Sequence, residues 1–317
     1  MLRSYQYTEK PYPEDTFQGR LFRDKQVEIA RRFVEGHPVR RDMKGSCPLC
    51  GRSGEYFYSK WRVDYLCCPN CKSVFAVYED SAVKEYQENP DLLELRTSEA
   101  YQGEISHNRQ DTWDEFLEWV EVRAFRFMGR NRNLDIVDYG NRYEGYVERI
   151  RKSPICGGYA LKGSILPQNG DVSRADMVLY LDRMQQEMQP DRRISELRGY
   201  LKERGLLILS TRAGSGFDIV TLKEKNGRIY PYEHILLPSV RGLVSFLEEN
   251  GFEILEITTP GVMDVKYVLD SKDRLDDREN FVRYLLEESS QAMLQEFQRF
   301  LQKGCLSSFV CVIARKR

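Results

Sequence analysis

Four cysteines form two C-x-x-C pairs, Cys47 with Cys50 and Cys68 with Cys71, and 17 residues separate the pairs. Two thiolates at this spacing can bind one ion from a tight turn, and two such turns complete a tetrahedral site. A Cys₄ site is structural because it leaves no coordination position for water. The spacing therefore predicts a zinc ribbon with these four ligands, and the adjacent Cys67 is expected to point away.

A second segment that could bind a ligand follows the apolar run 134–137 and reads DYGNRYEG over residues 138–145. A nucleotide-binding α/β fold usually has glycines in this place, because a side chain would collide with a closely bound ligand. Gly140 is the first of these glycines, but Arg142 and Glu144 occupy the next two expected positions. The segment is predicted to be a cofactor loop that has been rewritten.

The elements that would position this loop alternate along the second half of the chain. Apolar runs predict strands at 134–139, 177–181, 206–209, from 252, and 309–314. Amphipathic patterns predict helices at 143–152, from Pro190 to Gly205, from Ser239 to Gly251, and about 278–303. Alternating strands and helices indicate an α/β fold, with a mostly parallel sheet covered on both faces.

Four regions are expected along the chain. Residues 1–44 form an N-terminal arm with a helix at about 22–35, and residues 45–80 form the zinc ribbon. Residues 81–130 form a helical connector, in which the aromatic stripe from Trp113 to Phe127 is expected to lie in the core. Residues 131–317 form the α/β domain.

Composition argues against several classes of partner. The net charge is −1, so no basic field favours nucleic acid or anionic lipid as a partner. The polar start lacks the apolar region of a signal peptide, and no apolar stretch is long enough to span a membrane. The expected protein is cytoplasmic, with no membrane partner.

Several segments, in order, resemble one family. They are the turn at 138–140, the strand and loop at 175–182 before Pro190, the segment 201–210, the segment 230–242 and the ending 306–316. Together they resemble class I S-adenosylmethionine-dependent methyltransferases, and more narrowly bacterial members with an N-terminal zinc ribbon. Some of those are sugar C-methyltransferases. The resemblance implies a Rossmann-like sheet preceded by a small ribbon and a helical segment.

The resemblance also implies site residues. S-adenosylmethionine would be held by Asp138, Gly140, Asn141, Gly145 and Asp182. The sugar C-methyltransferases use a Tyr/Glu/His cluster as base and support, and Tyr232, Glu233 and His234 are the matching candidates.

The middle of the α/β domain departs from the family pattern. Between Asp138 and Asp176 the family fits a second strand, a helix and a third strand. Here the segment 153–174 has room for a strand at 159–161 but not for a full helix. It also lacks an acidic residue at a strand end, which in the family holds the ribose hydroxyls.

Three functions remain open. The first is an active methyltransferase acting on a small molecule, such as a nucleotide-linked sugar or another biosynthetic intermediate. The second is an inactive, methyltransferase-like protein that serves as a scaffold or binds a partner protein. The third is a nucleic-acid methyltransferase that uses the ribbon for recognition, which the neutral charge disfavours.

Overall fold

The computed structural model describes residues 17–37, 45–129, 133–166 and 172–317, without the side chains of 17–20 and 107–112. Most of the predicted N-terminal arm, 1–16 and 38–44, therefore lies outside the described residues. Within the described part, no helix is long and apolar enough to cross a membrane.

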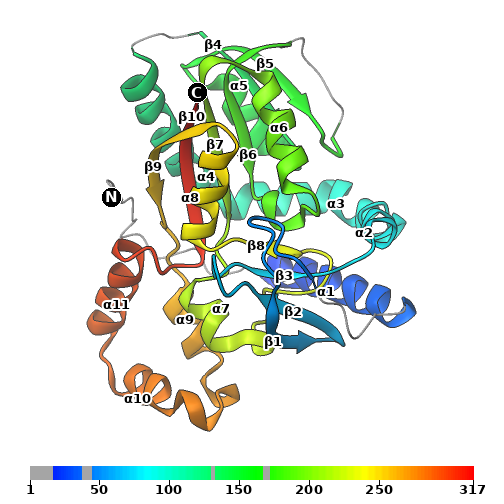
Figure 1. The fold of residues 1–317 in the computed structure, drawn as a ribbon, viewed down its shortest axis with the longest axis vertical. Helices are drawn as coiled ribbons and strands as arrows, with labels where there is room; N and C mark the ends of the chain where they lie inside the picture. Colours follow the sequence, from blue (N-terminus) through cyan, green and yellow to red (C-terminus); the bar gives the residue numbers. More distant parts are fainter. Residues whose placement is uncertain (1–16, 38–44, 130–132, 167–171) are drawn as a thin grey trace.

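Two sheets organise the chain (Figure 1). The larger has six strands in the order β5-β4-β6-β7-β10-β9. Its strands are β4 (Leu134–Tyr139), β5 (Cys156–Lys162), β6 (Ala175–Leu181), β7 (Leu201–Arg212), β9 (Phe252–Thr258) and β10 (Phe309–Lys316). β5, β4, β6 and β7 pair in parallel, and β10 is antiparallel to both β7 and β9. This arrangement confirms the predicted α/β class with a Rossmann-like sheet.

Helices cover both faces of this sheet because its strands are apolar on both sides. α4 (Glu99–Met128) and α5 (Glu144–Lys152) pack on one face, and α6 (Pro190–Tyr200) and α8 (Val240–Glu249) on the other. The side chains of neighbouring residues in one strand point to opposite faces of the sheet, as those of Leu207 and Ile208 do in β7. The predicted core stripe in α4 is confirmed at Trp113 and Val120, which are buried beneath the sheet.

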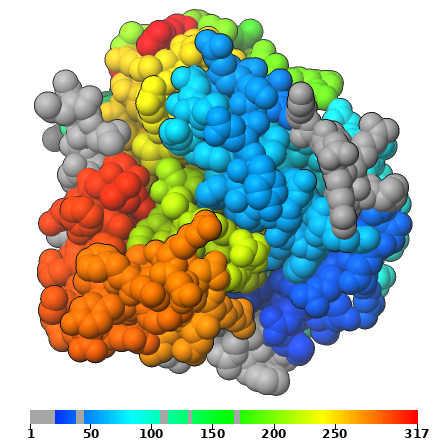
Figure 2. Space-filling view, turned by 60° about the horizontal axis from the view of Figure 1, so that its bottom comes forward, coloured from blue at the N-terminus to red at the C-terminus, as the bar shows by residue number. Residues whose placement is uncertain are grey.

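The smaller sheet joins the ribbon to the α/β part. Its order is β1-β2-β3-β8, from β1 (Glu55–Lys60), β2 (Val63–Cys67), β3 (Val74–Ala76) and β8 (Leu236–Leu237). Because β8 lies far along the chain, the expected ribbon and α/β regions share backbone hydrogen bonds. In Figure 2 the ribbon, in blue to cyan, lies beside the helices in orange to red, with the yellow-green segment around residue 220 between them.

Helices also lead into and out of these sheets. α1 (Phe17–Gly36), α2 (Asp80–Gln87) and α3 (Pro90–Thr97) precede α4. α7 (Phe217–Leu222), α9 (Asp264–Leu269), α10 (Asn280–Glu288) and α11 (Gln291–Lys303) pack together around one apolar cluster. The short 3₁₀ turns are η1 (Met184–Gln186), η2 (Lys223–Lys225), η3 (Lys272–Arg274) and η4 (Asp277–Glu279).

Two boundary predictions are wrong. The helix expected at 278–303 is two helices, because Ser290 begins α11 with a hydrogen bond from the backbone N–H of Met293. The helix expected to end at Gly205 stops at Tyr200, and β7 begins at Leu201. Leu201 is fully buried, but as a strand residue paired with Ala175.

The order of the parallel strands locates a ligand site. The chain moves from β4 to the edge strand β5 and then returns to the other side of β4 as β6. In open α/β sheets, ligands bind at the carboxyl ends of the strands, where the strand order reverses in this way. That position lies between Tyr139 at the end of β4 and Leu181 at the end of β6.

Candidate functional site

The four predicted zinc ligands converge. The sulfur atoms of Cys47, Cys50, Cys68 and Cys71 all lie within 4.8 Å of one another, and Cys67 is not part of this group. The Sγ atoms of Cys47 and Cys71 are 3.5 Å apart, as are those of Cys50 and Cys68. A tetrahedral zinc thiolate centre needs sulfur atoms about 3.8 Å apart, from Zn–S bonds of about 2.3 Å. The four thiols therefore fit a structural zinc ion.

This cysteine cluster is built into the α/β core. Ser239 caps α8, accepting a hydrogen bond of 2.8 Å from the backbone N–H of Gly242. The same hydroxyl donates to the carbonyl oxygen of Cys71, and the backbone N–H of Ser239 donates to Ser73 Oγ over 2.9 Å. The second cysteine pair therefore holds the start of α8 in place, as well as β8 beside β3.

The predicted cofactor loop lies at the reversal point, and its acid is deeply buried. Asp138 is fully buried at the end of β4, and its Oδ2 accepts hydrogen bonds from Asn141 Nδ2 and the Tyr159 hydroxyl. Its Oδ1 has no hydrogen-bond partner among the described residues. Asn141 is used structurally, since its Oδ1 accepts from the backbone N–H of Tyr143.

The space above Gly140 is filled. Gly140 has a φ of +80°, a left-handed conformation that favours glycine. A Cβ at this position would lie only 2.9 Å from Nε of Arg183 and 3.1 Å from its Cγ. The Arg183 side chain, which begins just after β6, therefore lies on the turn that a bound cofactor would need to approach.

The neighbouring parts of the loop are also occupied. A Cβ on Gly145 would meet Ser106 Oγ and would lie 3.3 Å from Trp113, so α4 packs directly against the start of α5. The edge strand β5 ends at Lys162, a basic residue, where the resemblance implies an acidic residue for ribose hydroxyls. The described residues between β5 and β6 contain no helix.

Asp182 lies at the end of β6, on the other side of the reversal point. It has a left-handed φ of +54°. Its backbone N–H donates to the Ser210 carbonyl at 3.0 Å, and its Oδ1 accepts from Ser210 Oγ at 3.2 Å. The structure thus brings Asp138, Gly140, Asn141 and Asp182 to neighbouring strand ends, and their assignment to a cofactor stays a prediction.

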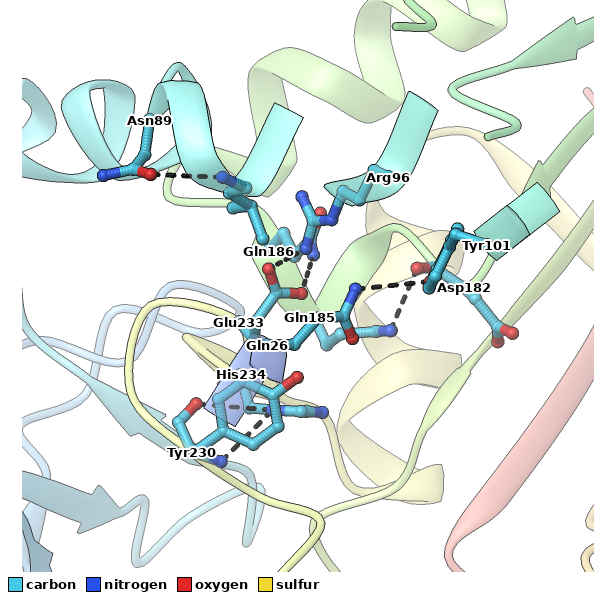
Figure 3. A network of polar contacts seen from close by, with 11 residues as sticks. Gln26, Asn89, Arg96, Tyr101, Asp182, Gln185, Gln186, Tyr230, Glu233 and His234 are labelled. Carbon is cyan, nitrogen blue, oxygen red and sulfur yellow. Dashed lines mark hydrogen bonds and ion pairs between the residues drawn. The ribbon is translucent and has the colours of Figure 1, made fainter. Parts of the chain in front are cut away.

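The three predicted catalytic residues are adjacent in sequence but face different surroundings. Tyr232 packs among aromatic rings, 4.9 Å from Phe33 and 4.4 Å from Tyr78 between ring centroids. His234 Nδ1 lies 3.3 Å from both the backbone nitrogen and the carbonyl oxygen of Tyr230 (Figure 3). Burial, followed by the charge of Arg212, lowers the pKa of His234 to about 3. The imidazole is therefore neutral, and its Nδ1 is engaged by the backbone of Tyr230 in the same turn.

Glu233 forms a buried polar centre with Arg96 and Gln186, which were not predicted as site residues. Arg96, from the last turn of α3, forms an ion pair with Glu233 Oε1, and both side chains are less than one-tenth exposed. Gln186 Nε2 donates to Glu233 Oε2 over 2.5 Å, as Figure 3 shows. Burial raises the pKa of Glu233, but the charges of Arg96 and Arg142 lower it to about 2. Glu233 is ionised and is placed to hold cations rather than to accept a proton near neutral pH.

Replacing Asp138 with Asn tests the burial of this acid. Burial raises the pKa of Asp138 to about 6, against the effect of its two hydrogen bonds. Because this folded-state pKa exceeds the unfolded value of 3.8, ionisation destabilises the folded protein as pH rises from about 4 through 6. As the pH is raised from about 5 to 7.5, the free energy of unfolding of Asp138→Asn should therefore rise by about 1 kcal/mol relative to that of the wild-type protein. Urea denaturation of both proteins at each pH measures this shift, and an unchanged difference would contradict it.

Comparison with known proteins finds similarity only among solved structures. No family model and no curated protein matches the sequence. A putative sarcosine dimethylglycine methyltransferase from Galdieria sulphuraria is 13% identical, covering 63% of this chain and 84% of that one, with a TM-score of 0.38. A putative methyltransferase from Bacillus halodurans is 17% identical, and the match covers 62% of this chain and 97% of that one, with a TM-score of 0.37.

A third similar structure has a bound cofactor. The Haemonchus contortus phosphoethanolamine N-methyltransferase 2 in complex with S-adenosyl-L-methionine is 16% identical, covering 61% of this chain and 50% of that one, with a TM-score of 0.36. These similar structures are methyltransferases. Since every TM-score is below 0.5, the fold assignment rests on the strand order of the chain itself.

Proposed function

We propose that this chain is a methyltransferase-like protein that no longer uses S-adenosylmethionine and serves as a binding module. The observation that carries this proposal is the Arg183 side chain lying on the Gly140 turn. A cofactor that approaches this backbone closely would first have to displace that side chain. As they stand, the residues of the loop do not fit S-adenosylmethionine, and we derive no reaction step through it.

The charges at the strand ends support the same proposal. S-adenosylmethionine carries a sulfonium, an ammonium group and one carboxylate, so its methionine end has a net charge of +1. The strand ends present Arg183, Arg142 and Lys162. Burial, followed by the charge of Arg142, lowers the pKa of Arg183 to about 9, so a further cation beside it would be unfavourable. A cytoplasmic partner protein or an anionic small molecule is the proposed ligand of such a module.

The second candidate is an active S-adenosylmethionine-dependent methyltransferase with a small-molecule acceptor, such as a sugar or a biosynthetic intermediate. One observation favours it, because Asp138 Oδ1 is buried without a partner and an ammonium group could satisfy it. In that case Arg183 would have to swing away from Gly140, and His234 would have to accept a proton through Nε2, because its Nδ1 is engaged by the Tyr230 backbone.

Isothermal titration calorimetry of the zinc-loaded protein with S-adenosylmethionine and S-adenosylhomocysteine separates the two candidates. We expect no binding heat at millimolar ligand for the wild-type protein. An Arg183→Ala variant clears the Gly140 turn, and Arg192→Ala, an exposed arginine on α6, is the matched control. Micromolar binding by the wild-type protein would overturn the proposal in favour of the methyltransferase. Binding only by Arg183→Ala would support the proposal and identify Arg183 as the obstacle.

A further inference from the structure

Three arginine residues converge at the carboxyl ends of β4 and β6. Arg96 lies in the last turn of α3, Arg142 lies in the loop after β4, and Arg183 lies two residues after the end of β6. The buried side-chain amide of Gln102 ties two of these segments together. Its Nε2 donates to the carbonyl oxygen of Arg96 at 2.7 Å and to that of Arg142 at 2.8 Å.

Among the described residues, a carboxylate pairs with only one of these three guanidinium groups, which is the pair of Glu233 with Arg96. Both oxygens of Glu233 are already engaged, one by Arg96 and the other by Gln186. Within the described part of the chain, the guanidinium groups of Arg142 and Arg183 have neither a hydrogen-bond acceptor nor a carboxylate within ion-pair distance. The cluster of Arg96, Arg142, Arg183 and Glu233 therefore carries a net charge of +2 (three cations and one anion).

A buried donor in the cluster is also unsatisfied. The Arg96 side chain is 6% exposed, and its Nε is fully buried without a hydrogen-bond partner. Leaving a buried charged donor unpaired costs free energy, and an anion that accepts from it would recover that cost. The arginines also repel one another, because the charges of Arg142 and Arg96 both lower the pKa of Arg183.

We propose that this arginine cluster binds the dianion of a phosphate monoester. Guanidinium groups offer paired donors that match phosphate oxygens, and a dianion neutralises the net charge of the cluster. A carboxylate would neutralise only half of it. The inference rests on the proposed function, since the phosphate would bind beside the Arg183 side chain that covers the Gly140 turn.

The test is calorimetric titration of the zinc-loaded protein with inorganic phosphate at constant ionic strength, with acetate as the monoanion control. We expect saturable binding of one phosphate per chain and at least tenfold weaker binding of acetate. Arg142→Gln and Arg183→Gln should each weaken phosphate binding at least tenfold. Arg192→Gln changes the net charge equally on an exposed part of α6 and should leave binding unchanged.

Each outcome bears on one proposal alone. Absence of saturable phosphate binding, or equal weakening by all three variants, would overturn the phosphate site and leave the loss of S-adenosylmethionine binding untouched. Binding of S-adenosylmethionine would overturn the proposed function, whatever phosphate does. Thermal unfolding of each variant without ligand shows whether it is folded, and if one variant is unfolded, the other still decides the test.

Discussion

The Cys68→Ser variant is expected to lose its zinc and to unfold at a temperature at least about 10 °C lower than the wild-type protein. Four sulfur atoms within 4.8 Å of one another hold the ribbon together, and three ligands hold zinc far less tightly. Metal binding contributes on the order of 10 kcal/mol to folding in isolated zinc-finger peptides, so losing even part of it is a large effect.

Cys67→Ser provides the matched control. Cys67 adjoins Cys68 and is half-buried, but the one hydrogen bond that its sulfur makes with the described residues is to the carbonyl oxygen of Cys68, at 3.9 Å. This variant should keep one zinc per chain and the wild-type unfolding temperature. Elemental analysis and thermal unfolding of both variants make the measurement. Retention of zinc by Cys68→Ser, or its loss from Cys67→Ser, would show that the ligand set is wrong.

The consequences of zinc loss should reach the α/β part of the molecule. Cys71 and Ser73 hydrogen-bond Ser239 at the start of α8, and β3 pairs with β8. Hydrogen exchange should therefore speed up over residues 236–249 when zinc is removed, as well as in the ribbon. Exchange that changes only in residues 45–80 would show that the ribbon is energetically separate.

The cysteine cluster and the positions of the buried strands could be predicted from the sequence because both depend on local patterns. Two C-x-x-C pairs define their own turns, and buried strands such as β4 and β6 are continuous apolar runs. Local patterns are less decisive where two structures compete. Residues 201–205 continue a helical pattern, but pairing of Leu201 with Ala175 on β6 makes them a strand.

The polar centre at the site could not be predicted because its members are distant in sequence. Arg96 and Glu233 are 137 residues apart, and Gln186 and Glu233 are 47 apart. Glu233 was singled out by its neighbours Tyr232 and His234, whose side chains turn out to face elsewhere. The one available signal was Arg142, which takes the place of a loop glycine and brings a positive charge to this turn. The position of Arg183 above Gly140 depends on how β4 and β6 lie side by side.

Glu233→Gln is expected to destabilise the folded protein by about 3–5 kcal/mol, which is typical of removing one partner of a buried ion pair. The Glu233 and Arg96 side chains are 9% and 6% exposed, so water cannot replace the lost partner. Arg96→Met should cost less than Glu233→Gln. Without Arg96, Glu233 still accepts from Gln186 and lies in the field of Arg142, whereas without Glu233 three arginines remain with no acid. Urea denaturation of the two variants measures the order, and equal or reversed costs would contradict this view of the cluster.

The double variant Arg96→Met with Glu233→Gln completes the test. If the two residues act as a pair, the double change should cost less than the sum of the single changes. Phosphate adds a second comparison, since it supplies the negative charge that Glu233→Gln removes. A ligand that binds only the folded state stabilises it according to its concentration and affinity. Phosphate should therefore raise the unfolding temperature of Glu233→Gln more than that of the wild-type protein. A smaller rise would mean that phosphate binds away from Glu233, and the arginine cluster would then be a purely structural network around one buried acid.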